Sequence, residues 1–212
     1  YGERFCGFVR HLRRDTGIPD LPVIVAQLNR WSADTDEAAD RRWSAVREQQ
    51  RILPEMLPGC GVVPAIDLSL SDAIHTSAEG NIKLGERFAN AALGMVYGRD
   101  ILWQAPDIFS AEADCSATRI RLRFSHVPRG TNGVSSRVRD FTVEDGGGFI
   151  PLSSVEAPND GTVTLILSRP SGADAVVHCG FGADPVHTIR RAGDVMPLLC
   201  FYRFAISGLG EE

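Results

Sequence analysis

Asp72 and His75 are the residues of this sequence whose types and spacing could do chemistry. They stand three residues apart in a segment expected to form a turn. At that spacing the carboxylate can accept a hydrogen bond from one imidazole nitrogen, which fixes the tautomer and leaves the other nitrogen able to deprotonate a nucleophile. The pair would be two-thirds of a serine-hydrolase triad, without an obvious nucleophile. The alternative is a turn aspartate beside a surface histidine.

The surroundings of the pair favour the catalytic interpretation. An apolar strand is expected before it, and Thr76-Ser-Ala-Glu79 can form a capping box for the helix that follows. The positive end of that helix disfavours an imidazolium at His75, and the carboxylate of Asp72 would offset this effect during proton transfer. Asp67 is a weaker candidate for the same role, and we expect it to hydrogen-bond the backbone where the loop begins.

Polar side chains also follow the preceding strand, at Gln27 and Asn29. In open α/β sheets, ligands bind outside the carboxyl ends of the strands, so both amides could bind substrate or support the loops of the site. Amides at strand ends more often satisfy the backbone, and that alternative stays open. Arg47 and Gln50 are expected to form an internal ion pair or a solvated helix face.

The other histidines and the cysteines give no sign of a metal site or a cofactor. His11, His126, His178 and His187 have no partner at ligand spacing, and we interpret them as structural or surface residues. The five cysteines form no CxxC pair, which argues against zinc. Free thiols are the simplest interpretation, although one or two disulfides remain open for a secreted protein. The sequence contains no G-x-S-x-G, GxGxxG or Walker motif.

Composition excludes two classes of partner. The chain has 212 residues, of which 43% are hydrophobic, and its net charge is −5. Such a chain offers no broad basic surface for a nucleic-acid backbone. It also has no stretch of about 18 apolar residues, so no membrane span is predicted.

The first half of the sequence predicts alternating helices and strands. Helical periodicity covers residues 1–14, 36–53 and about 76–97, and nearly continuous apolar runs at 22–29 and 61–68 are typical of buried parallel strands. A two-stranded sheet is too small for an independent core. We therefore expect a doubly wound α/β domain, with its first part outside this chain. The buried face of the last helix is expected to hold Ile82, Gly85, Phe88, Ala89, Ala92 and Val96.

The pattern changes near Trp103. Short β-type runs separated by turn-rich segments are expected at 117–124, 140–142, 149–152, 162–167, 175–178 and 200–205. Their spacing predicts an antiparallel β-sandwich. The chain is thus divided into residues 1–103, part of an α/β domain, and residues 104–212, a β-rich accessory domain.

Several segments together resemble a known family. Residues 72–93, beginning Asp-Ala-Ile-His, resemble the last catalytic block of the SGNH hydrolases, and more narrowly of the sialate O-acetylesterases, which are carbohydrate acetylesterases. Residues 21–28 resemble the "lPv..vQL" strand of that family, and residues 46–50 its "iReaQ" helix. Residues 122–124 and 141–149 resemble its β-rich C-terminal region.

The resemblance implies a fold and an activity. The fold would be the C-terminal part of a three-layer α/β/α (flavodoxin-like) SGNH hydrolase domain followed by a β-sandwich-like domain. The activity would be serine-dependent removal of O-acetyl groups from carbohydrates, sialic acids among them, without a cofactor. Only Asp72 and His75 carry over from the family's triad, because its Gly-x-Ser and "QGE"-type blocks are missing here.

Two function hypotheses follow. In the first, an N-terminal segment or a second chain supplies the serine, and this chain alone is inactive; the start at Tyr1, without an initiator Met, fits an excised piece. In the second, the protein binds carbohydrate or a partner without catalysis, and the Asp72–His75 pair is vestigial. The resemblance alone suggests a secreted, periplasmic or lysosomal location, which the residues leave undetermined.

Overall fold

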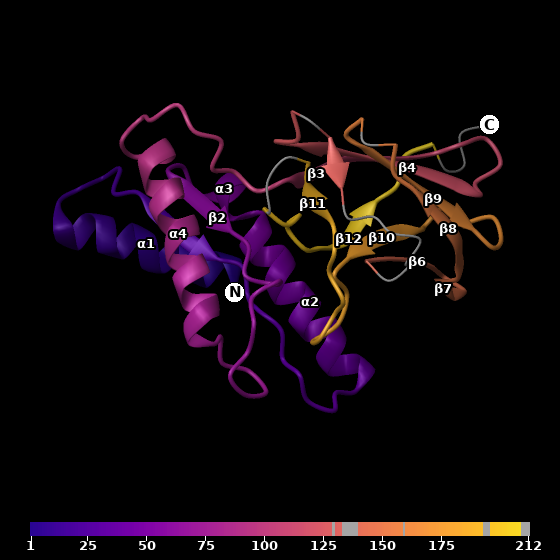
Figure 1. Ribbon diagram of the computed structural model, residues 1–212, viewed down its shortest axis with the longest axis horizontal. Helices are drawn as coiled ribbons and strands as arrows, with labels where there is room; N and C mark the ends of the chain where they lie inside the picture. The colour runs from indigo at the N-terminus through magenta and orange to yellow at the C-terminus, as the bar shows by residue number, and fades with distance from the viewer. Residues whose placement is uncertain (129, 133–139, 159, 193–195, 209–212) are drawn as a thin grey trace.

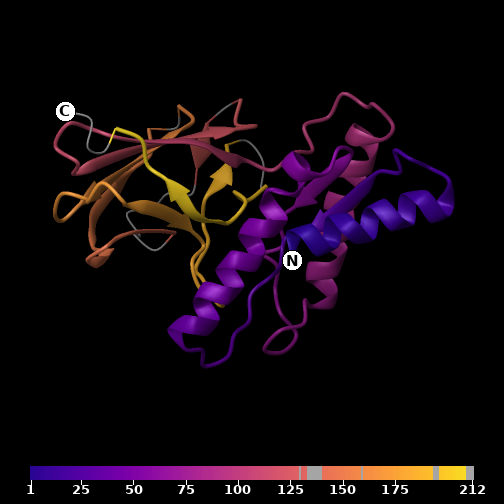
Figure 2. The ribbon, with the colours of Figure 1, turned by 180° about the vertical axis from the view of Figure 1, so that it is seen from behind.

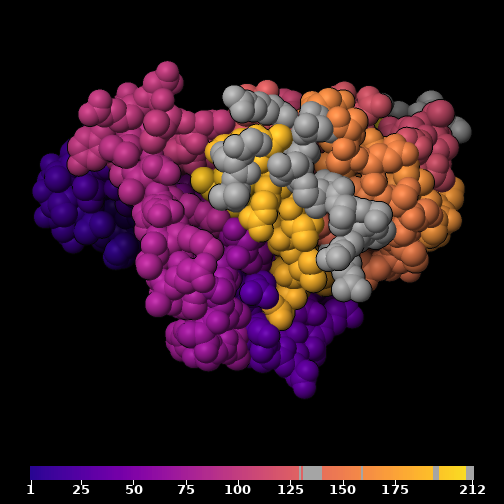
Figure 3. Space-filling view, in the orientation of Figure 1, coloured from indigo at the N-terminus to yellow at the C-terminus, as the bar shows by residue number. Residues whose placement is uncertain are grey.

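The computed structural model describes residues 1–128, 130–132, 140–158, 160–192 and 196–208. Helices and two parallel strands make up the first half of the chain, and antiparallel strands make up the second (Figure 1). In the space-filling view, the yellow C-terminal part of the chain lies directly against the magenta and violet segments of the first half (Figure 3). The fold is therefore mixed α/β, as the sequence predicts.

The first half is built on a short parallel sheet. Its elements are α1 (Gly2–Thr16), β1 (Val23–Ala26), α2 (Glu37–Arg51), α3 (Leu53–Met56), β2 (Cys60–Val63) and α4 (Ala78–Met95). Strand β1 pairs with β2 in parallel, from Val23 opposite Cys60 to Ala26 opposite Val63. Helix α4 lies in front of the strands in Figure 1, whereas α1 and α2 are in front when the molecule is seen from behind (Figure 2). Helices thus flank both faces of the strands.

The start of α4 differs from the predicted capping box by one residue. Ser77, not Thr76, is the N-cap, and its hydroxyl accepts a hydrogen bond from the backbone N–H of Gly80 at 3.1 Å. The hydroxyl of Thr76 accepts instead from the side chain of Asn29, at 2.9 Å. Glu79 pairs with Lys83 one turn later. The predicted cap is wrong because Thr76 is used in a long-range contact.

Two surfaces of the first half that the sequence predicts to be buried are not fully buried. Ile82 is 67% exposed and Val96 46%, so the predicted buried face of α4 is wrong for these residues. The helix instead buries Gly80, Arg87 and Ala91. All four apolar residues of β1 are only partly buried. Apolar periodicity alone therefore does not establish burial for these residues.

The second half consists mainly of two four-stranded antiparallel sheets. One has the order β12-β10-β6-β7 and the other β3-β4-β9-β8. Their strands are β3 (Asp107–Ala113), β4 (Arg119–Ser125), β6 (Phe141–Asp145), β7 (Gly148–Ile150), β8 (Leu152–Glu156), β9 (Thr162–Leu167), β10 (Val176–Cys179) and β12 (Phe201–Ala205). A small further pair joins β5 (Thr131–Asn132) to β11 (Arg190–Arg191). One hydrophobic core contains residues from both large sheets.

The alternating pattern of β4 is confirmed, since Ile120 and Leu122 are fully buried while Arg119 and Arg121 are exposed. Two details of the strand prediction are wrong. The expected run at 149–152 is split at Pro151 between β7 and β8, which belong to different sheets, because proline lacks the N–H that would continue a ladder. Strand β3 was not expected at all.

Arg47 joins the two halves of the chain. Its side chain is 1% exposed, and its guanidinium donates to five backbone carbonyl groups. Two belong to the segment after β1 and three to the loop after β10: Leu28 at 3.0 Å, Asn29 at 3.0 Å, Gly180 at 3.3 Å, Gly182 at 2.6 Å and Ala183 at 3.1 Å. Burial lowers the pKa of Arg47 to about 10, which keeps it charged at neutral pH. The expected ion pair or solvated face is wrong for this residue.

Replacing Arg47 tests the importance of this junction. We expect Arg47→Leu to lower the free energy of unfolding by at least about 3 kcal/mol, because it leaves buried carbonyl groups without donors. Arg42→Leu, at a 72% exposed side chain on the same helix, should change it by no more than about 0.5 kcal/mol. Urea denaturation followed by circular dichroism measures both, and equal effects would show that the carbonyl contacts are unimportant.

Candidate active site at the Asp72–His75 turn

The loop between β2 and α4 forms a narrow, closed turn. The backbone N–H of Ser71 donates to the carbonyl of His75 at 2.8 Å, and that of Ser77 donates to Ser69 at 2.8 Å. Leu70 and Thr76 form an isolated antiparallel bridge between these two bonds. Asp72 and His75 therefore lie at the tip of a turn whose two arms are held together by the backbone.

Asp72 organises the tip of this turn through both carboxylate oxygens. Oδ1 accepts from the backbone N–H groups of Ile74 and His75, at 2.9 and 2.8 Å, and Oδ2 lies 2.8 Å from Nδ1 of His75. These hydrogen bonds, led by the backbone N–H of His75, lower the pKa of Asp72 to about 2. An ionised carboxylate can only accept hydrogen bonds, so Nδ1 carries the proton and Nε2 presents its lone pair.

The free nitrogen of His75 faces solvent. The side chain of His75 is 76% exposed and that of Asp72 56%. Among the residues that the structure describes, none hydrogen-bonds Nε2 of His75. The imidazole is therefore held in one tautomer, with Nε2 accessible from solvent.

Asn29 lies next to this turn, as its position after β1 suggests. Its side-chain amide donates to Thr76 Oγ1 at 2.9 Å, and its backbone carbonyl accepts from Trp43 Nε1 at 3.0 Å. The backbone N–H of Ser32 donates to Ala73 at 2.7 Å. The segment after β1 thus supports the turn that carries His75 from two directions.

Gln27 is placed elsewhere, inside the junction between the two halves. Its amide nitrogen donates to the carbonyls of Cys200 and Arg47, and its oxygen accepts from the backbone N–H of Cys200 at 2.9 Å. The residue is 1% exposed. Its surroundings are those of a backbone-satisfying amide, the alternative that the sequence left open. The structure therefore brings Asn29 to the His75 turn, but not Gln27.

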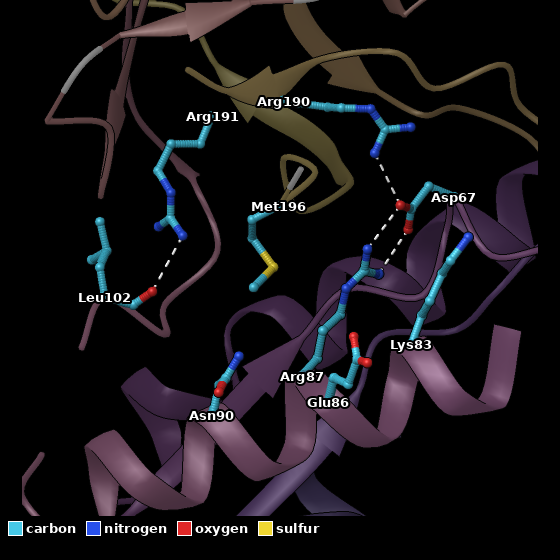
Figure 4. A pocket seen from close by; sticks show the side chains of 9 residues that line it. All are labelled: Asp67, Lys83, Glu86, Arg87, Asn90, Leu102, Arg190, Arg191 and Met196. Atoms are coloured by element: carbon cyan, nitrogen blue, oxygen red, sulfur yellow. Dashed lines mark hydrogen bonds and ion pairs between the residues drawn. The ribbon is translucent and has the colours of Figure 1, made fainter. Parts of the chain in front are cut away.

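Asp67 forms ion pairs rather than the expected backbone hydrogen bonds. Arg87 of α4 donates to both of its oxygens, at 2.7 and 2.8 Å, and Arg190 of the second half donates to Oδ2 at 2.9 Å (Figure 4). The two arginines lower the pKa of Asp67 although burial opposes them. The sequence gives no signal for this bridge, because Asp67 and Arg190 are 123 positions apart.

A cavity lies beside this bridge. It has a volume of about 640 Å³, between α4 and the segment that contains Arg190, Arg191 and Met196 (Figure 4). Lys83, Glu86, Arg87 and Asn90 line it from the helix. Leu102 and Met196 add apolar surface, so the lining of the cavity is mixed.

The remaining histidines and cysteines are placed apart from the turn. His178 and His187 are buried in the second half, where burial lowers the pKa of both, and of His178 to about 4. All five cysteines are free thiols, and only Cys115 is exposed.

Within the described ranges, no three His, Cys, Asp or Glu side chains gather as metal ligands. No helix in the same ranges is long and apolar enough to cross a membrane.

Nuclear magnetic resonance can test the geometry of the turn. We expect long-range ¹H–¹⁵N spectra at pH 8 to show His75 as the Nδ1–H tautomer, because ionised Asp72 accepts that hydrogen bond. The carboxyl carbon of Asp72 should titrate near pH 2, below the unperturbed value of 3.8. Its folded-state pKa is depressed, so its stabilising contribution is present above about pH 4 and is lost as the pH falls through about 2. In Asp72→Asn the tautomer preference should disappear, and an unchanged tautomer would contradict this assignment.

Comparisons with known proteins find a family similar to the first part of the chain. Residues 1–94 match the family described as "SASA: Carbohydrate esterase, sialic acid-specific acetylesterase". No curated protein matches the sequence. Among solved structures, XAC1771, a carbohydrate acetylesterase from Xanthomonas citri, matches 95% of this chain with a TM-score of 0.77 and 23% identity. That similarity shows a shared fold, and this chain spans only 45% of the longer protein.

Weaker matches add nothing to the assignment. Two structures of the bacterial S-layer protein SbsC match 59% and 60% of this chain and 27% and 16% of their own. Both have 13% identity and a TM-score of 0.36, too low to carry an argument. The match over residues 1–94 confirms the resemblance to the sialic acid-specific acetylesterases, which are carbohydrate esterases, and it covers less than half of the chain.

Proposed function

We propose that this chain provides the Asp–His pair of a carbohydrate O-acetylesterase, which hydrolyses O-acetyl esters of sugars, sialic acids among them. The observation that carries the proposal is the 2.8 Å contact between His75 Nδ1 and Asp72 Oδ2, with Nε2 open to solvent. The family match over residues 1–94 includes this turn, and it supports the esterase chemistry.

In the proposed mechanism a serine attacks the acetyl carbonyl carbon, and His75 Nε2 takes the proton from its hydroxyl. The imidazolium that forms is stabilised by Asp72 and returns this proton to the sugar oxygen as the C–O bond breaks. Water then attacks the acetyl-enzyme, His75 takes one proton from it, and the serine leaves with that proton as acetate is released. Asp72 remains ionised throughout, which its low pKa favours.

The serine would come from an N-terminal segment or from a second chain, since none among the described residues contacts His75 Nε2. Strand β1 offers a place for such a segment. It pairs with β2 along one edge, and all four of its residues are half-buried. Exposed apolar side chains on the flanking helices, Phe8 on α1 and Ile82 on α4, provide further surface to cover. Additional parallel strands beside β1 would complete a buried sheet.

This proposal gives each half of the chain a place in a larger fold. Residues 1–103 would be the C-terminal part of a three-layer α/β/α SGNH hydrolase domain. Residues 104–212 would be a β-sandwich-like accessory domain, whose two sheets share the hydrophobic core described above. The structural match to XAC1771 over 95% of the chain supports this arrangement as a fold.

Replacing His75 tests the proposed mechanism in the complete assembly. We expect His75→Ala to lower turnover of an acetylated sugar by about four to six orders of magnitude, the range found for triad histidines. His11→Ala, at an exposed histidine of α1, is the matched control and should retain full turnover.

A fluorophosphonate probe provides the complementary experiment, since it labels activated serines. We expect labelling of the assembly, and much slower labelling with His75→Ala. If the assembly contains no reactive serine, the esterase proposal is wrong. If His75→Ala keeps full turnover, His75 has no part in the mechanism. Binding of acetylated sugar without any turnover would favour the non-catalytic alternative, with a vestigial pair.

A further inference from the structure

Residues 29–32 contact the candidate turn on both sides of its histidine. The side chain of Asn29 donates to Thr76 Oγ1 at 2.9 Å, one residue after the histidine. The backbone N–H of Ser32 donates to the carbonyl of Ala73 at 2.7 Å, two residues before it. The 29–32 segment therefore brackets the imidazole with one side-chain and one backbone hydrogen bond.

The orientation of the Asn29 amide is determined by the next residue. Its Oδ1 accepts from the backbone N–H of Arg30 at 2.8 Å, and a backbone N–H can only donate. The Nδ2 end must therefore face Thr76, where it donates to the hydroxyl oxygen. Both ends of the amide are bound within the protein, and Asn29 is only 8% exposed, which favours a supporting role over contact with substrate.

The 29–32 segment is itself anchored to the rest of the protein. The backbone carbonyl of Asn29 accepts from Trp43 Nε1 and from Arg47, both at 3.0 Å. The backbone N–H of Trp31 donates to the carbonyl of Ala183, in the second half, at 2.9 Å. A hydrogen bond restrains a turn only if its other partner is held in place, and these contacts meet that condition.

The direction of the turn depends on restraints of this kind. Bonds between its two arms and the Asp72–His75 contact fix its shape and the tautomer of the imidazole. Its tilt relative to the sheet depends on contacts outside the turn, and the 29–32 segment supplies two of them close to the tip. A displacement of about 1 Å at a reacting group can lower the rate about a hundredfold.

From this arrangement we infer that Asn29 is a positioning residue for His75: through Thr76 it holds Nε2 in the direction that proton transfer from the serine requires. The inference rests on the proposed esterase function for its effect on turnover, but the restraint on the turn exists in this chain alone. Two tasks are thus separate, since Asp72 selects the tautomer and Asn29 the direction. Loss of Asn29 slows the chemical step, while the tautomer and the affinity for substrate are retained.

Kinetics of the complete assembly test the role of Asn29 in turnover. We expect Asn29→Ala to lower kcat for an acetylated sugar by about ten- to a hundredfold, the effect of a displacement of up to about 1 Å, with KM within about twofold of the wild type. Asn90→Ala, at an exposed asparagine of α4, is the matched control and should keep both constants. An unchanged kcat would overturn the inference, and so would a rise in KM alone, because it would mark Asn29 as a substrate contact.

A double-mutant cycle with Thr76→Val tests whether Asn29 acts through Thr76. The substitution removes the acceptor oxygen and keeps the branched shape of the side chain. We expect it to lower kcat about as much as Asn29→Ala does, and the double variant to be no slower than either single variant. Effects that multiply in the double variant would show that the two residues act separately and would contradict the inference.

Nuclear magnetic resonance of this chain gives a readout that does not depend on the serine. In Asn29→Ala we expect His75 to remain the Nδ1–H tautomer, ¹⁵N relaxation to show greater backbone motion at residues 73–76, and the circular dichroism spectrum to match that of the wild type. Unchanged relaxation at the turn, loss of the tautomer or loss of the fold would overturn the inference, whether or not the assembly has esterase activity. Absence of that activity in the wild type would instead count against the proposed function.

Discussion

The guanidinium of Arg47, buried between the two halves of the chain, determines how the loops around the candidate site are held. A buried charge is costly unless its hydrogen bonds are satisfied, and here five backbone carbonyl groups satisfy it. Carbonyl oxygens from both halves must converge on one planar fork of donors. The segment after β1 and the loop after β10 are therefore fixed relative to each other by their hydrogen bonds to Arg47, and the Arg30–Asp184 ion pair joins the same two segments.

This constraint extends to the His75 turn through Asn29. The carbonyl of Asn29 accepts from Arg47, and its side chain donates to Thr76, one residue beyond His75. On the other side, Gln27 bonds the backbone of Cys200 just before β12. The second half is thus built into the framework of the first, and its loop at 183–187 lies within reach of the same edge of the sheet. The position of His75 in the proposed catalysis depends on this shared framework.

The parts of this arrangement that are local in sequence could be predicted. The helix periods, the alternation of β4, and the Asp72–His75 contact all depend on residues within a few positions of each other. The long-range contacts could not be predicted, because nothing in the sequence around Arg47 distinguishes five distant carbonyls from a solvated surface. The Asp67–Arg190 bridge is hidden for the same reason. On α4, the apolar face is visible in the sequence, but periodicity does not say which element covers it.

The turn at Asp72 has a consequence for the order of folding. All three groups that donate to its carboxylate belong to Ile74 and His75, so these bonds close loops of only two or three residues. The entropy lost in closing such short loops is small compared with that of contacts between distant segments. The tautomer of His75 is therefore set by contacts within the turn itself and needs no contact between the two halves. The long-range contacts determine where the turn lies and so the direction in which Nε2 points.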